Sequence, residues 1–386
     1  MHILINGIPL LSCLTGIGNY VYNISKCLIN IDTCNQYTFF YGYFSSELQP
    51  FPHSRNIFSN LKFRTFKKAK FFTKKIPVVR NIARNAVKYY PKLIFDSKRF
   101  DIYFEPNYIP IDINAKKIVT TVHDFSFLLY PEWHPKDRIN YFWKTFYKQI
   151  YKSDLILTDS NFIKEEAKEF LRIDHDKIRT VYMGYDNTAF KLYDRAEVLN
   201  FQKDKGLPEN FILFVGSIEP RKNIEKLLQA YIQLPEYVKK EFRLVLAGFS
   251  GWENKNIMNL KDKMKKHVMF LGYLSVGELS VMYNSAKLFV YPSLYEGFGL
   301  PPVEAMACGC PVVVSNVASL PEVCGDAAYY VDPYNVESIA EGMYKVPTDN
   351  TLRKSLIEKG LERAKLFSWE KAAKEHLKVF EEVLNS

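Results

Sequence analysis

The chain has 386 residues, of which 47% are hydrophobic and 15% are aromatic. This length exceeds the roughly 100–200 residues of a usual domain, so we expect two domains, and the composition excludes a disordered chain. The six cysteines are too sparse and too irregularly spaced for a disulfide framework, which indicates a reducing compartment, and the net charge of +10 is concentrated in one segment.

The amino terminus begins as a buried strand at residues 2–5, without a basic region followed by an apolar signal core. No apolar run approaches the roughly 20 residues that span a bilayer. We therefore expect a cytoplasmic protein that is soluble or bound to a membrane surface.

Short apolar runs then alternate with helical patterns, which is typical of βα units that build a parallel sheet. A first series predicts strands at residues 2–5, 37–41, 101–104, 117–122, 155–158 and 178–182. Gly16 and Gly18 follow the first strand and are interpreted as a loop beside a cleft, ahead of an amphipathic helix. A dinucleotide fingerprint would require another glycine at Val21, which disfavours a dehydrogenase.

Residues 62–99 hold most of the excess positive charge, with cations interleaved among aromatic and aliphatic side chains. Only Asp96 opposes these cations, which are Lys62, Arg64, Lys67, Lys68, Lys70, Lys74, Lys75, Arg80, Arg84, Lys88, Lys92, Lys98 and Arg99. This pattern favours contact with an anionic lipid surface. An ordinary solvated face and single-stranded nucleic acid are the alternatives, and the motifs in the rest of the chain disfavour nucleic acid.

His123 comes at the carboxyl end of the predicted strand at 117–122, a usual position for ligand-binding groups in open α/β sheets. Asp174 and Asp176 are similar to a two-carboxylate metal clamp, but they stand between a helix and a strand and are interpreted as a turn. Cys308 and Cys310 have no second close pair and no nearby histidine, so no zinc site is predicted.

A polar stretch separates two series of strands. Residues 193–209 are interpreted as a linker between a domain at 1–192 and a domain at 210–367, and residues 368–386 as a helix that packs on the second sheet or crosses back to the first domain. The second series predicts strands at residues 211–215, 243–247, 268–271, 288–291 and 311–315.

Two adjacent cations and a glycine follow the first strand of this second series. Gly216, Arg221 and Lys222 lie between that strand and an amphipathic helix, where the cations could neutralise a leaving diphosphate. Leu274 follows the strand at 268–271, where nucleotide bases commonly lie in such sheets. Exposed cations without a ligand would be unfavourable at a helix start, because they face the positive end of the dipole.

The most informative stretch reads as a strand, a glycine loop and a helix over residues 288–315. Glu296 lies in the loop, and Glu304 is expected in the first helical turn. Free amides near Phe298, Gly299 and Leu300, together with the helix dipole, would suit a diphosphate. Glycines at 297 and 299 would let the backbone approach that ligand closely. Two carboxylates that simply favour the helix dipole are the alternative reading.

Two glutamates with seven residues between them, around the glycine loop, resemble the signature of retaining family 4 glycosyltransferases. The resemblance covers nearly the whole chain and implies an α/β GT-B fold, with two Rossmann-like, doubly wound domains that face a central cleft. It implies that Glu296 contacts the donor sugar, that Glu304 contacts the ribose, and that Arg221 and Lys222 bind the phosphates. Ser217 departs from the arginine that many relatives carry, so Arg221 would serve instead.

The same resemblance implies roles for residues of the first half. Gly16 and Gly18 would form the glycine loop of the first domain, and His123 would contact the transferring sugar and help to stabilise charge at its anomeric carbon. Backbone near Leu274 would contact the base. The GT-B resemblance also implies that no divalent cation is needed, because helix dipoles and basic side chains replace it.

The sequence nominates no nucleophile for a double displacement, so we expect same-face transfer with retention of configuration. Similarity to bacterial mannosyltransferases of surface polysaccharide assembly makes GDP-mannose the leading donor and a glycan or lipid-linked glycan the acceptor. No cofactor is expected besides the nucleotide-sugar substrate. A nucleotide-sugar epimerase of the same fold and a non-catalytic nucleotide-sugar-binding protein remain alternatives.

Overall fold

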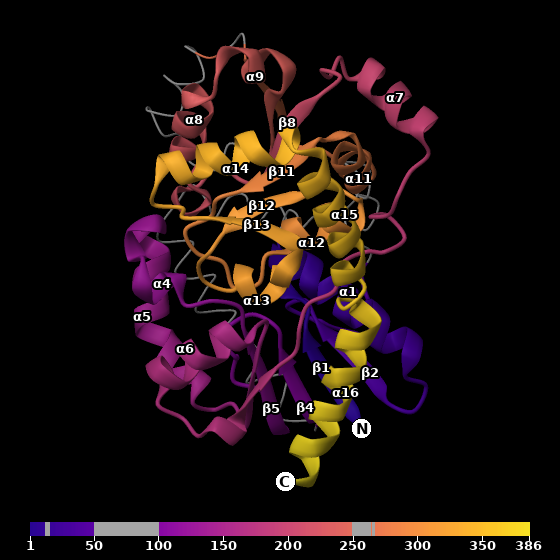
Figure 1. Cartoon of the computed structure of the whole chain (residues 1–386). Coiled ribbons are helices and arrows are strands. Elements are labelled where there is room, and N and C mark those ends of the chain that lie inside the picture. The colour runs from indigo at the N-terminus through magenta and orange to yellow at the C-terminus, as the bar shows by residue number, and fades with distance from the viewer. Residues whose placement is uncertain (12–15, 50–99, 249–263, 265–266) are drawn as a thin grey trace, which may run out of the picture.

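The computed structural model describes residues 1–11, 16–49, 100–248, 264 and 267–386, which form two α/β halves (Figure 1). The lower half in Figure 1 contains the amino-terminal sheet, and the upper half contains the second sheet. The basic segment at 62–99 lies outside the described residues, as does residue Cys13. Within the described ranges, no helix combines the length and hydropathy that crossing a bilayer requires.

The amino-terminal sheet has seven strands in the order β3-β2-β1-β4-β5-β6-β7. All neighbouring strands are parallel except β2 and β3. The strands are β1 (His2–Asn6), β2 (Gln36–Phe40), β3 (Phe44–Ser45), β4 (Phe100–Glu105), β5 (Ala115–Val122), β6 (Leu155–Thr158) and β7 (Ile178–Thr180). The predicted strands are present, whereas the short antiparallel strand β3 was not predicted.

The second sheet has six parallel strands in the order β10-β9-β8-β11-β12-β13. They are β8 (Phe211–Val215), β9 (Arg243–Ala247), β10 (Val268–Gly272), β11 (Leu288–Tyr291), β12 (Val312–Ser315) and β13 (Ala328–Val331). Strand β13 was not predicted, because it is a short edge strand whose first three residues are only half-buried.

In each sheet the chain adds strands first on one side of its first strand and then on the other side. Strand β1 lies between β2 and β4, and β8 lies between β9 and β11. In open α/β sheets, ligands bind beyond the carboxyl ends of the strands at such a switch point. The loops after β4, β8 and β11 are therefore the ones that the topology places at a ligand site.

Helices cover both sheets (Figure 1). The first half contains η1 (Ile8–Leu11), α1 (Gly16–Ile31), α4 (Ser126–Leu129), η2 (Pro131–Trp133), α5 (Lys136–Ile150), α6 (Asn161–Leu171) and η3 (His175–Lys177). The second contains η4 (Pro220–Lys222), α8 (Ile224–Gln233), α9 (Glu236–Glu241), α11 (Val276–Ser285), α12 (Leu300–Ala307), α13 (Leu320–Cys324), η5 (Gly325–Ala327), α14 (Val336–Thr348) and α15 (Asn350–Ala364).

Two segments differ from the expected organisation. The stretch interpreted as a linker contains helix α7 (Arg195–Asp204), which packs against α11. Gly16 and Gly18 lie in the first turn of α1 rather than in a loop, so the loop interpretation is wrong for these two residues. A Cβ on Gly16 would have no neighbour within 4 Å, whereas Gly18 is buried in the helix.

The last helix, α16 (Trp369–Asn385), leaves the second half and packs against α1 in the first. Its buried face includes Trp369, Ala373 and Phe380, and the Phe380 ring lies 5.4 Å from that of Phe104 at the end of β4. The carboxyl terminus accordingly lies at the bottom of Figure 1, beside the amino-terminal sheet. The two halves therefore share part of their hydrophobic core.

Candidate active site

The loop between β11 and α12 has its carbonyl oxygens bound by serine side chains from two directions. The Ser319 hydroxyl lies 2.9 Å from the carbonyl oxygens of both Glu296 and Phe298. From the other half of the molecule, the Ser160 hydroxyl donates to the carbonyl oxygen of Gly297 at 2.7 Å. These contacts fix the loop and leave its amide groups for other partners.

The amide groups at the start of α12 are free for a ligand. Those of Phe298, Gly299 and Leu300 have no hydrogen-bond partner among the described residues, and the next two residues are prolines, which have no amide hydrogen. Unpaired amides at the positive end of a helix dipole bind anions such as phosphate. The predicted anion site at these three residues is therefore chemically well formed.

The two glycines of the loop, Gly297 and Gly299, are required for different structural reasons. Gly299 has φ +105°, and a Cβ there would lie 2.7 Å from Leu320, so this position requires glycine. A Cβ on Gly297 would lie 1.9 Å from the carbonyl oxygen of His123. The interpretation of Gly297 as room for a ligand is therefore corrected: glycine is needed there because backbone of the first half approaches it.

The two cations Arg221 and Lys222 lie in η4, directly after β8. The turn ends at Asn223, which has the left-handed φ of +57° that asparagine tolerates better than most residues. Its side-chain amide donates to the carbonyl oxygens of Pro292 at 3.1 Å and Pro333 at 2.7 Å. Asn223 thereby fastens the cationic turn to the loop after the neighbouring strand β11.

Glu296 forms ion pairs with both cations. Its carboxylate oxygens lie 2.8 Å from Nη1 of Arg221 and 2.5 Å from Nζ of Lys222, and the Lys222 ammonium also contacts the Tyr291 hydroxyl. Burial opposes ionisation of Glu296, but Arg221 and then Lys222 outweigh it and lower its pKa to about 2. The sequence predicted all three residues, and the pairing of strands β8 and β11 brings them together.

The two cations of this cluster are balanced by two carboxylates, Glu296 and Glu219. Glu219 also contacts Arg221, with 3.2 Å between Oε1 and Nε. Burial, followed by the neighbouring Arg221, lowers the pKa of Lys222. A diphosphate at the start of α12 would add negative charge beside Arg221 and Lys222 and would favour the charged form of Lys222.

Glu304 is buried in α12 apart from the cationic cluster. It lies in the second turn of the helix, not in the first turn as expected, because α12 begins at Leu300. The Tyr283 hydroxyl donates to its carboxylate at 3.3 Å, and burial raises the pKa of Glu304 to about 7. Such a weakly bonded, buried carboxyl suits recognition of ligand hydroxyl groups.

Both ring nitrogens of His123 already have partners. Nδ1 lies 2.7 Å from Asp159 Oδ2, and Nε2 lies 2.9 Å from the carbonyl oxygen of Pro106. Two oxygen acceptors require two N–H donors, so the ring is an imidazolium. Burial alone would lower the pKa of His123, but Asp159 and the carbonyl of Pro106 raise it. The ring therefore has no free lone pair to offer a sugar.

Asp159 was not predicted from the sequence. It follows β6 at the same sheet edge as His123, and this position was the available signal. Its Oδ1 atom is buried and has no hydrogen-bond partner among the described residues. Asp159 holds the His123 ring, and it leaves one carboxylate oxygen unpaired at the junction with the loop after β11.

The remaining predicted donor-binding residues are Gly216, Leu274, Gly16 and Gly18. Gly216 follows β8, and its carbonyl oxygen would lie 1.9 Å from a Cβ on Gly248, so the two backbones pack closely. Leu274 is half-buried after β10, and Gly16 is exposed on α1. The predicted contacts of these residues with a nucleotide-sugar, and those of Gly18, stay predictions.

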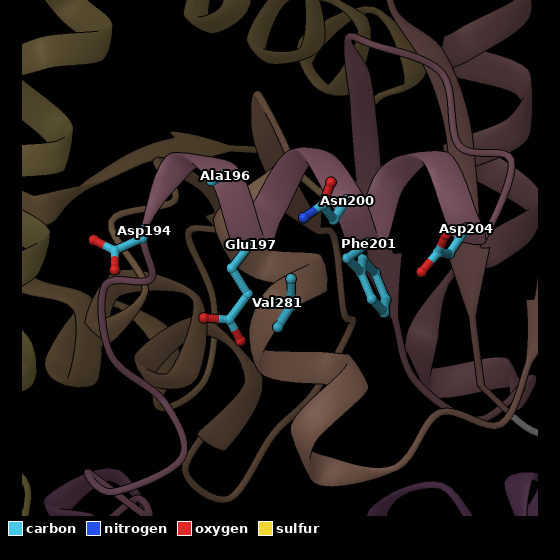
Figure 2. Close-up of a pocket in the computed structure, with 7 residues that line it drawn as sticks. All are labelled: Asp194, Ala196, Glu197, Asn200, Phe201, Asp204 and Val281. Carbon is cyan, nitrogen blue, oxygen red and sulfur yellow. The ribbon is translucent and has the colours of Figure 1, made fainter.

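A pocket of about 520 Å³ lies between α7 and α11, away from this cluster (Figure 2). Its lining residues are Asp194, Ala196, Glu197, Asn200, Phe201, Asp204 and Val281, none of which belongs to the candidate site. Among the described residues, no group of three or more His, Cys, Asp or Glu side chains is arranged to hold a metal ion. The chemistry of the loops after β8 and β11 therefore defines the candidate site, and the pocket does not.

Two doubly wound sheets that bring a basic pair to an anion-binding helix start define a glycosyltransferase of the GT-B fold. Residues 14–188 match the family described as Glycosyltransferase Family 4, and residues 195–363 match Glycosyl transferases group 1. The chain belongs to this family of glycosyltransferases.

Relatives in bacteria are similar over most of the chain. The O-antigen chain mannosyltransferase B of Escherichia coli is 35% identical over 369 residues, which cover 94% of each chain. The serotype-specific mannosyltransferase WbdA of Escherichia coli is 34% identical over 284 residues, which cover 72% of this chain and 35% of WbdA.

Solved structures share the fold. Sucrose-phosphate synthase of Thermosynechococcus elongatus superposes with a TM-score of 0.70 at 18% identity, and the two chains are covered to 100% and 99%. WaaG, a glycosyltransferase involved in lipopolysaccharide biosynthesis, gives a TM-score of 0.67 at 15% identity, with 98% and 99% covered. The predicted family and the predicted GT-B fold are confirmed.

Proposed function

We propose that the chain is a retaining, metal-independent hexosyltransferase that moves mannose from GDP-mannose to a glycan or lipid-linked glycan in polysaccharide assembly. The names of the relatives support mannose and polysaccharide. The observation that carries the proposal is the row of three amides at the start of α12 that have no partner among the described residues, two residues beyond a carboxylate that pairs with Arg221 and with the buried Lys222.

The proposed donor binds with its diphosphate against these amides and beside Arg221 and Lys222. The cations then share their charge between Glu296 and the phosphates, which stabilises the negative charge that develops on the leaving group. The bond between the anomeric carbon and the phosphate oxygen breaks while the acceptor oxygen attacks on the same face. The departing phosphate oxygen takes the acceptor's proton, so no separate base and no metal ion is required.

His123 has a different proposed role from the one that the resemblance implies. An imidazolium cannot stabilise positive charge at an anomeric carbon. The unpaired Oδ1 of Asp159 and the backbone carbonyl of His123 are negative groups at the same junction and are better suited to that task. His123 then acts by holding Asp159, and Glu304 in the second half offers its carboxyl group to the ribose hydroxyls.

A donor panel tests the proposal. The purified protein is incubated with GDP-, UDP- and dTDP-sugars and a membrane lipid extract, with a chelator present, and the consumed donor and the anomer of the product are identified by NMR. We expect consumption of GDP-mannose and an α-linked product. Isomerised sugar without an acceptor would instead support an epimerase, and no consumption of any donor would leave only a binding protein.

A variant links the chemistry to the basic pair. Lys222→Met should lower turnover by about 100-fold or more, because it removes a cation from the leaving group. Lys240→Met, an exposed lysine of α9 in the same half, is the matched control and should retain wild-type turnover. Equal rates for the two variants would contradict the assignment.

A further inference from the structure

The outer face of α5 carries an unusual repeat. Three aromatic residues recur every four residues, and each is followed by a lysine: Trp143 and Lys144, Tyr147 and Lys148, Tyr151 and Lys152. Because residues four apart are neighbours on a helix, the aromatic side chains form one stripe and the lysines form a second beside it. We call these six residues the α5 aromatic–lysine face.

These aromatic side chains are unusually open to solvent. Trp143 is 57% exposed and Tyr151 is 55% exposed, and the rings of Tyr147 and Tyr151 lie 6.2 Å apart in a stacked arrangement. Tyr147 packs partly on the core and the Tyr151 hydroxyl donates to the carbonyl oxygen of Leu171 at 2.9 Å, but the helix buries its own stripe of Phe142, Phe146 and Ile150 and leaves Trp143 in solvent. Exposed aromatic side chains gathered on one face indicate an interaction surface.

One lysine of this face, Lys152, is paired with Asp112, whereas the other two have no such partner among the described residues. Residues 138–152 contain no Asp or Glu, and within the described part of the chain Lys144 and Lys148 form no ion pair. On other exposed helices the lysines are paired at four-residue spacing, as in Lys374 with Glu370 at 2.7 Å on α16. The face therefore presents uncompensated positive charge beside its aromatic stripe.

We propose that the α5 aromatic–lysine face docks on the surface of an anionic lipid bilayer. Tryptophan and tyrosine rings lie at the level of lipid headgroups, where one edge of the ring is apolar and the other is wet. Lysines beside them reach the lipid phosphates, and each contributes about 1 kcal/mol of attraction. A second copy of the chain would present the same positive charge to this face and be repelled.

This surface is formed by a different part of the sequence from the basic segment at 62–99. It lies at the outer edge of the first half, on the opposite side from α16 in Figure 1. Docking through α5 would hold the half that contains His123 and Asp159 at the membrane. If the proposed function is right, a lipid-linked acceptor would reach the site from there, but the docking itself does not depend on which sugar is transferred.

Vesicle sedimentation tests the proposal with a charge-matched pair of variants. Wild-type protein, Lys144→Glu/Lys148→Glu and Lys374→Glu/Lys378→Glu are mixed with vesicles of phosphatidylcholine alone or with about a third phosphatidylglycerol. The α5 variant should bind the anionic vesicles at least about tenfold more weakly than wild type. The α16 variant has the same net charge and should bind within about twofold of wild type.

Tryptophan fluorescence gives a second measurement. A general effect of protein charge on vesicle binding would not change it. Anionic vesicles should shift the tryptophan emission to the blue, brominated lipids should quench it, and Trp143→Phe should lose most of both signals. Wild-type binding by the α5 double variant, or no preference for anionic vesicles, would overturn the proposal. So would loss of a dimer in the α5 variant by analytical ultracentrifugation together with unchanged vesicle binding.

Discussion

Charge compensation at Glu296 shows how a single residue serves both stability and function. The carboxylate is buried and is held between Arg221 and Lys222, so it balances two cations that would otherwise repel each other in a poorly solvated site. The resemblance implied only that Glu296 contacts the donor sugar. The ion pairs indicate that Glu296 also keeps the ligand-free protein stable.

Glu296→Gln should lower the free energy of unfolding by about 3 kcal/mol at pH 6, because it leaves the buried Lys222 without its carboxylate partner. GDP should raise the melting temperature of this variant more than that of wild type, since the diphosphate replaces the lost charge. Glu304→Gln without ligand is the control: at pH 6, below its pKa of about 7, Glu304 is largely protonated, and the change should cost little. Calorimetry measures the free energy of unfolding of each variant and the shift in its melting temperature with GDP.

The pH dependence of this ion pair has a definite sign. The pKa of Glu296 in the folded protein is about 2 against an ordinary value of 4.5, so its stabilisation is fully present above about pH 4.5. It is lost as the pH falls from there towards 2, where the folded carboxylate takes up its proton. Equal acid sensitivity of wild type and Glu296→Gln in that range would contradict the ion pairing.

Among the elements, helix α13 contacts both the donor loop and the first half of the molecule. Its capping residue Ser319 holds the loop carbonyls, and Glu322 accepts hydrogen bonds from the amides of Asn161 at 2.7 Å and Phe162 at 2.9 Å, which begin α6. The Tyr182 hydroxyl also donates to Glu322 at 2.8 Å. Separation of the halves would leave the start of α6 without these partners.

Glu322→Ala removes all three hydrogen bonds to this carboxylate. It should favour an open arrangement of the two halves and weaken donor binding by about 5- to 30-fold, because part of the lost free energy is needed to bring the halves together. Small-angle X-ray scattering should show a larger radius of gyration, and titration calorimetry should show the weaker binding. Glu337→Ala, an exposed acid of α14, is the control. An unchanged radius with unchanged affinity would show that α13 does not hold the halves together.

Across the whole molecule, α16 joins the end of the chain to the first half through a buried hydrogen-bond chain. His376 Nδ1 donates to the carbonyl oxygen of Ala372 at 2.7 Å, so its Nε2 accepts from the Tyr20 hydroxyl at 2.8 Å. Tyr20 in turn accepts from Thr121 at 3.0 Å. Burial lowers the pKa of His376 to about 4, which keeps the ring neutral and this chain intact.

The whole protein should therefore lose stability between about pH 6.5 and 4, because the unfolded state binds a proton at His376 that the folded state excludes. The contribution is about 3 kcal/mol and is fully present above pH 6.5. Denaturant unfolding of wild type and His376→Gln should show stability curves that converge towards pH 4. Parallel curves would mean that His376 is readily protonated in the folded protein.

Local patterns were enough to predict the strands that end at the site and the loop chemistry around Glu296. Buried parallel strands are continuous apolar runs, and a loop with glycines followed by prolines indicates a helix start. Strands β3 and β13 escaped this reasoning because they are short edge strands. The loop interpretation of Gly16 failed because a glycine at a helix start resembles one in a loop.

The sequence by itself determined the alternation of strands and helices, the family and the residues of the donor loop, because these depend on neighbours along the chain. Only the tertiary structure decided which partners those residues have. Glu296 meets Arg221 and Lys222 because β8 and β11 are paired, Gly297 meets His123 because the two halves touch, and α16 returns to α1. Contacts between residues far apart in the chain are set by how sheets and helices pack, and no local pattern records them.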